Sequence, residues 1–285
     1  MTRTRATLIG STAILLWSLL ALFTVGTAPV PPLLLNALCF GLGGLVGLGW
    51  IAASGGAGQL HGVGWKVYAF GTAGLFGYHL LYFTALRWAP AAEASLIAYL
   101  WPLLIVLLSG LLPGERLSRW HVAGAVLAFC GAALIVLRGS GGVSPAALPG
   151  LGLALLCAIT WAVYSVVSRR LGEVPTAAVA VFCLLTAGLS VVAHLALEET
   201  RWPTSSQGWL SVLALGLGPV GLAFYTWDVG MKRGNIQLLG VASYAAPLLS
   251  TLALILAGLA TPDAGLLVAA ALITSGAALA ARASA

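Results

Sequence analysis

The sequence predicts an all-α integral membrane protein with ten transmembrane helices, arranged as an inverted repeat of five plus five. Composition is the first observation behind this: of 285 residues, 60% are hydrophobic and 7% charged, with a mean hydropathy of +1.04. Soluble domains are about 45 to 50% apolar and about 25% charged. No soluble core could absorb this imbalance, so we expect the lipid bilayer to be the solvent of the chain.

The apolar residues fall into ten runs, which are the second observation. A helix of about twenty residues rises about 1.5 Å per residue and crosses a hydrocarbon core of about 30 Å. The first run is too long for a secretory signal, and short connectors leave no room for a soluble domain. The runs cover residues 7–26, 32–53, 65–87, 91–112, 120–138, 149–169, 176–197, 208–231, 236–258 and 263–282.

An internal repeat is the third observation. Tyr99–Pro102 (YLWP) and Tyr244–Pro247 (YAAP) lie 145 positions apart, and the same shift carries Gly131–Leu134 (GAAL) onto Gly276–Leu279 (GAAL). Because five is an odd number of crossings, the second copy would lie upside down relative to the first. We expect a first unit of residues 1–138, a Gly/Ser/Pro-rich linker at 139–148, and a second unit of 149–285.

The basic residues predict the orientation. With both termini on the cytoplasmic side, ten basic residues fall inside and three outside, which follows the positive-inside rule. Because they are not clustered on one patch, we expect no nucleic-acid partner. The inner set is Arg3, Arg5, Lys66, Arg116, Arg119, Arg169, Arg170, Lys232, Arg233 and Arg282, and the outer set is Arg87, Arg138 and Arg201.

A proline interrupts one apolar run in each half. Pro102 and Pro247 each lack a backbone donor, which would free the carbonyls of Ala98 and Ser243. Lipid cannot satisfy such groups, so we expect them to face protein or a water-filled cavity. Paired interruptions in a repeated membrane protein indicate a solute site near the bilayer midplane, and hence a transporter.

Four ionisable residues fall within the predicted spans, where charge is costly. Glu93 and His194 lie near span ends, where solvation at the interface explains them. His79 lies in the interior of its span. Asp228 and Lys232 are spaced as an i, i+4 pair; they are candidates for ion coupling, and the simpler alternative is mutual neutralisation.

Aromatic and polar residues deep in the spans are the candidate substrate-binding residues. Tyr78, His79 and Tyr82 cover one arc of a helix, and Tyr99 shares a face with Pro102. Aromatic residues on one face of a helix can either pack against a neighbouring helix or line a cavity. A histidine that faced lipid would be costly, which favours the cavity. The candidate binding residues are Tyr78, His79, Tyr82, Tyr99, Trp101, Pro102, Trp161, Tyr164, Ser243, Tyr244 and Pro247. Trp17 is a further aromatic residue deep in its span, and so a further candidate for a cavity wall.

Several motifs resemble a known family. Thr2–Gly10 with Leu16–Ser18, the Tyr99–Pro102 motif, Trp161 with Tyr164, Trp227–Asn235 and Ser243–Leu248 are similar to the bacterial aromatic amino acid exporters of the drug/metabolite transporter superfamily (EamA type). The resemblance implies ten helices in an inverted repeat, an inner-membrane location, and export of aromatic and other amino acids, with cationic toxic compounds as a further class. The Gly114–Leu117 loop resembles the superfamily, whereas the matching position in the second half lacks that motif.

We therefore expect a secondary carrier that exports aromatic amino acids, other neutral ones and related small metabolites by alternating access. The alternatives are a carrier or channel for another small solute, such as a sugar or a cationic drug. We expect no enzyme activity, cofactor or metal, because no nucleophile constellation, phosphate-binding glycine loop or metal-ligand spacing is present. The sequence leaves the oligomeric state open, a monomer included.

Overall fold

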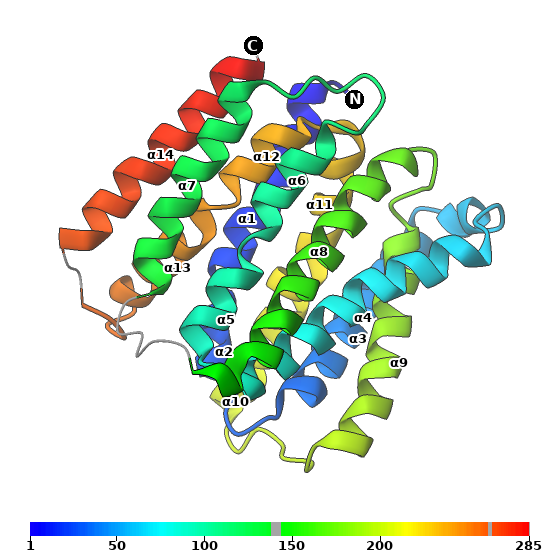
Figure 1. Ribbon diagram of the computed structural model, residues 1–285. Coiled ribbons are helices and arrows are strands. Elements are labelled where there is room, and N and C mark those ends of the chain that lie inside the picture. The colour runs from blue at the N-terminus through cyan, green and yellow to red at the C-terminus, as the bar shows by residue number, and fades with distance from the viewer. Residues whose placement is uncertain (138–143, 262–263, 285) are drawn as a thin grey trace.

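The computed structural model describes residues 1–137, 144–261 and 264–284, and every regular element in those ranges is helical (Figure 1). The α-helices are α1 (Arg3–Ser18), α2 (Leu20–Val25), α3 (Pro32–Ala53), α4 (Trp65–Trp88), α5 (Ala91–Ala98), α6 (Trp101–Ser109), α7 (Arg119–Val136), α8 (Leu148–Arg170), α9 (Ala178–Leu197), α10 (Ser206–Leu217), α11 (Ala223–Arg233), α12 (Ile236–Ala242), α13 (Ala245–Leu256) and α14 (Ala264–Ser284). Short 3-10 helices η1 (Gly56–Leu60) and η2 (Pro145–Ala147) and a π-helical turn η3 (Gly218–Leu222) complete them.

Among the described residues, nine helical stretches are long and apolar enough to cross a membrane. They correspond to nine of the ten predicted runs, and the third run, α4, is the exception. With 24 residues α4 is about 36 Å long, which is sufficient for a crossing. Its hydropathy is lower because it carries three tyrosines, His79 and several glycines.

Polar residues start several of these helices. The side chains of Thr2, Ser205 and Asn235 accept backbone N–H bonds at the starts of α1, α10 and α12. At α7, Ser118 and His121 form a reciprocal capping pair. These caps satisfy donors that a helix start leaves without partners, so the ends of the spans are defined by local sequence.

The runs that contain Pro102 and Pro247 are each broken into two helices, as these prolines predict. The first breaks at Tyr99 and Leu100 between α5 and α6, and the second at Ser243 and Tyr244 between α12 and α13. Each proline lies in the first turn of the second helix, where its missing N–H removes no helical bond. The expectation of a free Ser243 carbonyl is wrong, because the Ala246 N–H donates to it at 3.1 Å.

Helices pack in four long pairs: α7 with α14, α3 with α9, α4 with α8, and α1 with α11 (Figure 1). Glycine allows two of these contacts to be close. A Cβ on Gly10 would lie 2.8 Å from the Gly230 Cα, and one on Gly124 would lie 2.5 Å from the Gly276 carbonyl oxygen. Small residues at such crossings are how membrane helices approach each other without a hydrophobic driving force.

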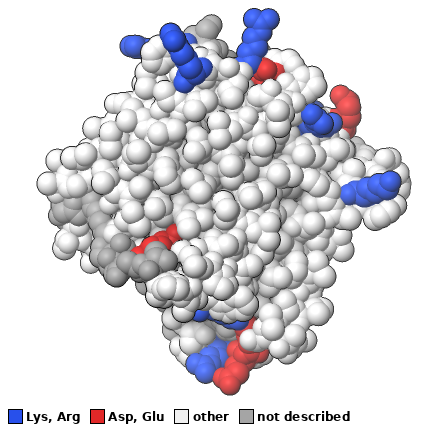
Figure 2. All heavy atoms as spheres, in the orientation of Figure 1, with Lys and Arg blue, Asp and Glu red and all other residues white. Residues whose placement is uncertain are grey.

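Both termini of the chain lie at one end of the bundle, which is called the termini end below; the opposite end is the far end (Figure 1). On the face in Figure 2, most Lys and Arg side chains gather near the termini end, and a broad area without Lys or Arg lies between the ends. This distribution is what a bilayer around the middle of the molecule requires. The predicted linker residues 139–143, together with Arg138 and Asp263, lie outside the described residues.

Candidate functional site: a buried aromatic cluster

Tryptophans from four helices meet at the centre of the bundle. The Trp17 ring centroid lies 5.8 Å from Trp161, 6.2 Å from Trp101 and 5.0 Å from Trp227. Phe224 adds a fifth ring, 5.7 Å from Trp161. These rings come from α1, α6, α8 and α11, so both halves of the chain contribute. Most of the contacts are edge-on or tilted, the geometry that aromatic quadrupoles prefer.

Two indole N–H groups of this cluster have fixed partners. The Trp17 Nε1 donates to the Pro219 carbonyl oxygen at 3.0 Å, in the π-helical turn η3. The Trp227 Nε1 donates to the buried Ser165 hydroxyl at 3.1 Å. A buried indole N–H needs such a partner, so both rings are held in defined orientations.

His79 lies beside the tryptophans, on the middle of α4. Its Nδ1 is 2.7 Å from the Leu75 carbonyl oxygen, which can only accept, so Nδ1 carries the proton and a neutral ring keeps Nε2 as an acceptor. The imidazole contacts Phe40 at 5.0 Å and Phe224 at 6.2 Å. The structure thus brings the predicted histidine into the aromatic cluster.

Three tyrosines extend the cluster towards the far end. Tyr78 stacks on Tyr82 at 6.1 Å and contacts Trp161 at 5.4 Å. The Tyr82 hydroxyl is hydrogen-bonded to the Ser95 hydroxyl at 3.1 Å, and Tyr99 lies near both tyrosines. These hydroxyl groups supply the polar part of an otherwise aromatic surface.

Exposure changes across the cluster. Tyr78, Tyr82 and Tyr99 are half-buried, as are His79 and Ser95. The rings nearer the termini end are buried: Trp101 is 7% exposed, Trp161 3% and Trp227 1%. The cluster is therefore tightly packed on the side of the termini end and more open on the side of the far end.

The structure places the other predicted site residues as follows. Tyr164 belongs to the cluster, 5.1 Å from Trp161, and Pro102 is buried in the first turn of α6. The predicted residues at the second helix break do not join it. Tyr244 is fully buried in a separate core with Phe129 from α7, at 5.9 Å. Ser243 and Pro247 are buried beside the same helix break.

Asp228 and Lys232 form a buried ion pair on α11. Both Asp228 carboxylate oxygens lie 2.9 Å from the Lys232 Nζ. The Thr176 hydroxyl donates to Asp228 at 2.8 Å, and the Lys232 Nζ donates to the Val174 carbonyl oxygen at 2.9 Å. Both charges are fully partnered, which fits mutual neutralisation and fixes the 171–177 loop against α11.

Glu93 and His194 were expected to be solvated at the membrane interface, and this expectation is wrong because both are buried. His194 is 2% exposed and Glu93 is 8% exposed. His194 is held by Glu198 at 3.0 Å and Thr200 at 2.9 Å, and Glu198 also caps the start of α3. Neither carboxylate oxygen of Glu93 has a hydrogen-bond partner among the described residues. Sequence position near a span end therefore does not ensure contact with water.

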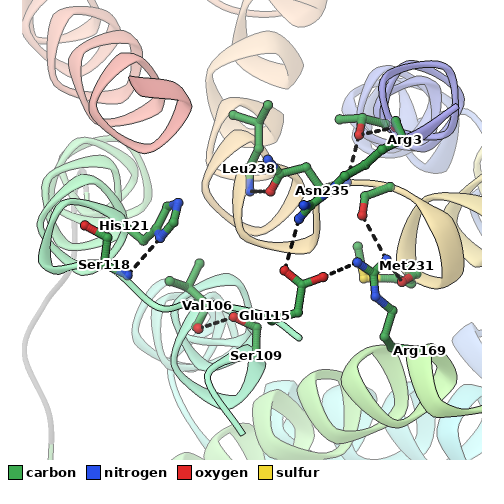
Figure 3. Close-up of polar contacts among 12 residues, drawn as sticks. Arg3, Val106, Ser109, Glu115, Ser118, His121, Arg169, Met231, Asn235 and Leu238 are labelled. Carbon is green, nitrogen blue, oxygen red and sulfur yellow. Dashed lines mark hydrogen bonds and ion pairs between the residues drawn. The ribbon is translucent and has the colours of Figure 1, made fainter. Parts of the chain in front are cut away.

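At the termini end, Glu115 and Arg169 connect the loop after α6 with three helices (Figure 3). Its carboxylate accepts from the Arg169 Nη2 and, at 3.0 Å, from the Arg3 Nη2. Arg169 also donates through Nη1 to the carbonyl oxygens of Met231 at 3.0 Å and Gly234 at 2.8 Å. This set is called the Glu115 clasp. It connects α1, the loop after α6, α8 and the end of α11.

The electrostatics of Glu115 follow from this geometry. Burial alone would raise the pKa of its carboxyl group. The hydrogen bond from Arg169 and the charges of Arg169 and Arg3 outweigh burial and hold the pKa below its ordinary value. The clasp therefore contains a carboxylate at neutral pH.

Sequence reasoning missed three rings of the cluster: Phe40, Phe224 and Trp227. The 145-residue shift was a signal that could have found two of them. It maps His79 onto Phe224 and Tyr82 onto Trp227, and His79 and Phe224 are in contact. Phe40 has no comparable signal, because a single phenylalanine in an apolar helix looks like ordinary packing.

An all-helical chain with these apolar stretches is a multi-pass membrane protein. The EamA-like transporter family matches it twice, at residues 4–137 and 148–282. The chain belongs to this family, and it is a transporter rather than an enzyme.

Known relatives agree with this assignment. An aromatic amino acid exporter, YddG, from Ancylobacter novellus is 55% identical over 282 residues, covering 98% of each chain. Proteins of the same name from Salmonella typhimurium and Escherichia coli are 28% and 29% identical, covering 88% of each chain. A solved crystal structure superimposes with a TM-score of 0.93 at 56% identity over 98% of both chains. These relatives and the apolar helices identify a bacterial membrane protein.

Proposed function

We propose that the protein is a secondary carrier of the inner membrane that exports aromatic amino acids, with other neutral amino acids and related small metabolites in its range. The observation that carries the proposal is the buried aromatic cluster shared by both halves of the chain. Flat rings on several sides suit an aromatic side chain, through stacking and edge contacts. The exporters named above, which cover nearly the whole chain, support the same substrate class.

In this proposal ten helices form an inverted repeat, with units 1–138 and 149–285 joined by the linker 139–148. The double family match supports it, since its limits lie close to those units. Contacts between repeat-related residues support it further. A Cβ on Gly131 would lie 2.9 Å from the Ala269 carbonyl oxygen. The shift of 145 converts this pair into Gly276 and Gly124, which meet in the same crossing of α7 and α14.

The same relationship extends to the aromatic cluster. Trp17 and Trp161, 144 residues apart, lie 5.8 Å from each other. His79 and Phe224, 145 apart, lie 6.2 Å from each other. Residues related by a two-fold axis are neighbours only near that axis. The proposed solute site therefore lies where an inverted repeat would place it, between the two halves.

We infer that the termini end is cytoplasmic, since ten of the thirteen basic residues belong to that side under this orientation. The described conformation is then closed towards the cytoplasm. The Glu115 clasp ties the first half to the second half there, and the buried tryptophans lie between the clasp and the half-buried tyrosines. Alternating access would open this end and pack the tyrosine side.

Within the site, the aromatic rings would hold the side chain of the amino acid and the hydroxyl groups of Tyr82, Tyr99 and Ser95 its charged groups. His79 would contribute one acceptor, Nε2, for the ammonium group. Hydrogen bonds from neutral groups suit a zwitterion, whose charges cancel overall. The site needs no charged side chain for this role, which agrees with Asp228 and Lys232 neutralising each other.

Counterflow tests the function. Purified protein in liposomes loaded with unlabelled phenylalanine should accumulate labelled phenylalanine added outside, with saturation and with stimulation by the internal pool. Empty liposomes and liposomes loaded with a sugar are the controls. No exchange with phenylalanine, tryptophan, tyrosine or threonine would contradict the proposed substrates, and exchange with the sugar alone would favour a different carrier.

A further inference from the structure

Arg169 is oriented by backbone contacts through Nη1, and its Nη2 binds a carboxylate. Its Nη1 donates to the carbonyl oxygens of Met231 and Gly234 at 3.0 and 2.8 Å, so the plane of the group is fixed by the end of α11. Its Nη2 faces the Glu115 carboxylate. A fixed guanidinium edge is a good receptor for a carboxylate, because two or more N–H groups can converge on it.

Gln237 lies against the same carboxylate and has an unused donor. Its side chain is 2% exposed. The Nε2 lies near enough to the Glu115 carboxylate to help lower its pKa, but the contact falls outside normal hydrogen-bond geometry. An amide N–H buried without a partner is costly, and such groups call for a ligand or a second conformation. A free carboxylate at this place would therefore be near both Arg169 and Gln237.

The Glu115 carboxylate that now contacts Arg169 comes from a loop, and a hollow in the protein surface lies next to Arg169. Glu115 lies between α6 and α7, after Gly114, whose φ of 81° is in the left-handed region. A hollow of about 530 Å³ adjoins Arg169 and is lined by Leu112, Pro113, Arg169 and Arg170. Pockets for small molecules have volumes of about 300 to 1,000 Å³. A solute arriving from the termini end could therefore reach Arg169 as the loop moves.

We propose that Arg169 and Gln237 form a loading site for the carboxylate group of the exported solute, and that the Glu115 carboxylate occupies this site while the termini end is closed. The inference rests on the proposed function, because it requires a carboxylate-bearing solute that enters from this end. Glu115 is then an internal competitor: it holds the end shut in the absence of solute and is displaced when a free carboxylate binds.

The test is the KM for phenylalanine offered to the termini end, in inside-out membrane vesicles. Arg169→Lys should raise the KM about tenfold, because lysine cannot present two parallel N–H groups. Gln237→Met should raise it severalfold, because it removes the amide N–H that would bind the carboxylate, and the yield of folded protein is compared with that of the parent. Glu115→Gln should lower the KM, because a neutral amide competes more weakly for Arg169. Arg5→Lys, at an exposed position of α1 at the same end, should leave it unchanged.

The opposite signs separate a binding role from a purely structural one. If Glu115 and Arg169 only tie helices together, their two variants should shift the KM in the same direction, and Gln237→Met should match the parent. Either result would overturn the loading site while the parent still transports phenylalanine. If Arg169→Lys does not fold, Gln237→Met and Glu115→Gln carry the same test. Absence of phenylalanine flux in the parent would instead overturn the proposed function itself.

Discussion

The hydroxyl group of Tyr244 accepts a hydrogen bond from the backbone N–H of Leu103 at 3.1 Å. Leu103 is in the first turn of α6, where a helix start leaves its N–H groups without helical partners. The break before Pro102 in one half is thus stabilised by a side chain from the break before Pro247 in the other. The two interrupted helices are joined at the depth where lipid could not satisfy that donor.

Tyr244→Phe should therefore destabilise the protein. Removal of the hydroxyl leaves the buried Leu103 N–H without a partner, at a cost of about 1 to 3 kcal/mol. Thermal unfolding in detergent should show a lower midpoint. Tyr99→Phe is the matched control, because among the described residues its hydroxyl has no hydrogen bond to the backbone. Equal midpoints for both variants would contradict this role of Tyr244.

His79→Ala and Tyr99→Ala should each lower phenylalanine flux while leaving the yield of folded protein intact. Loss of one hydrogen-bonding ring from the site corresponds to about tenfold in affinity. Flux into proteoliposomes at fixed protein density measures the effect. His61→Ala, in the loop between η1 and α4, is the control and should transport at the parent rate. Parent-like flux in both site variants would place the site elsewhere.

Gly230→Ala should weaken the packing of α1 on α11. The added Cβ would lie 2.7 Å from the Gly10 Cα, a backbone atom that cannot rotate away. Such overpacking costs about 1 to 3 kcal/mol. Gly49→Ala in α3 is the opposite case, since a Cβ there meets nothing within 4 Å, and the variant should melt at or above the parent temperature. A Gly230→Ala midpoint equal to that of the parent would show that α1 shifts freely.

The stability that Glu115 provides should depend on acid pH. Its pKa is lowered in the folded protein from the ordinary 4.5, so the charged form is favoured by folding and the clasp contributes fully above pH 4.5. The contribution is lost as the pH falls further, through the folded pKa. The difference in melting midpoint between the parent and Glu115→Gln should be constant near neutral pH and shrink below pH 4.5. A difference independent of pH across this range would show that the charge of Glu115 is not what stabilises the end.

Much of the fold was predictable because lipid constrains it strongly. Run length and composition predicted the membrane helices, and the prolines predicted the two breaks, since a proline in a helix interior removes a bond that lipid cannot replace. The π-helical turn at Gly218–Leu222 was not predicted. A proline between two glycines is compatible with several backbone paths, and packing against α1 and α3 selects one of them.

The site was predicted less completely than the fold. His79 and Tyr82 both contact Tyr78, and Tyr78 and Trp101 both contact Trp161, so these predicted residues lie together. Tyr244 was expected beside them and instead packs in a second core. Matching motifs in the two halves of a repeat lie at the same depth in the membrane. Their side chains need not contact the same kind of residue, since the side chains around the two breaks differ. Depth can be estimated from sequence, whereas the direction in which a ring points depends on tertiary packing.

Protection of a cysteine at position 95 tests the central claim most directly. In a Cys130→Ser background the three remaining cysteines are buried, so Ser95→Cys, beside Tyr82, offers one half-buried thiol. A membrane-impermeant thiol reagent added at the far end should label it, and phenylalanine should slow labelling with the same half-saturating concentration as transport. Labelling that is unchanged by saturating phenylalanine, in a variant that still transports it, would show that the aromatic cluster is not the solute site.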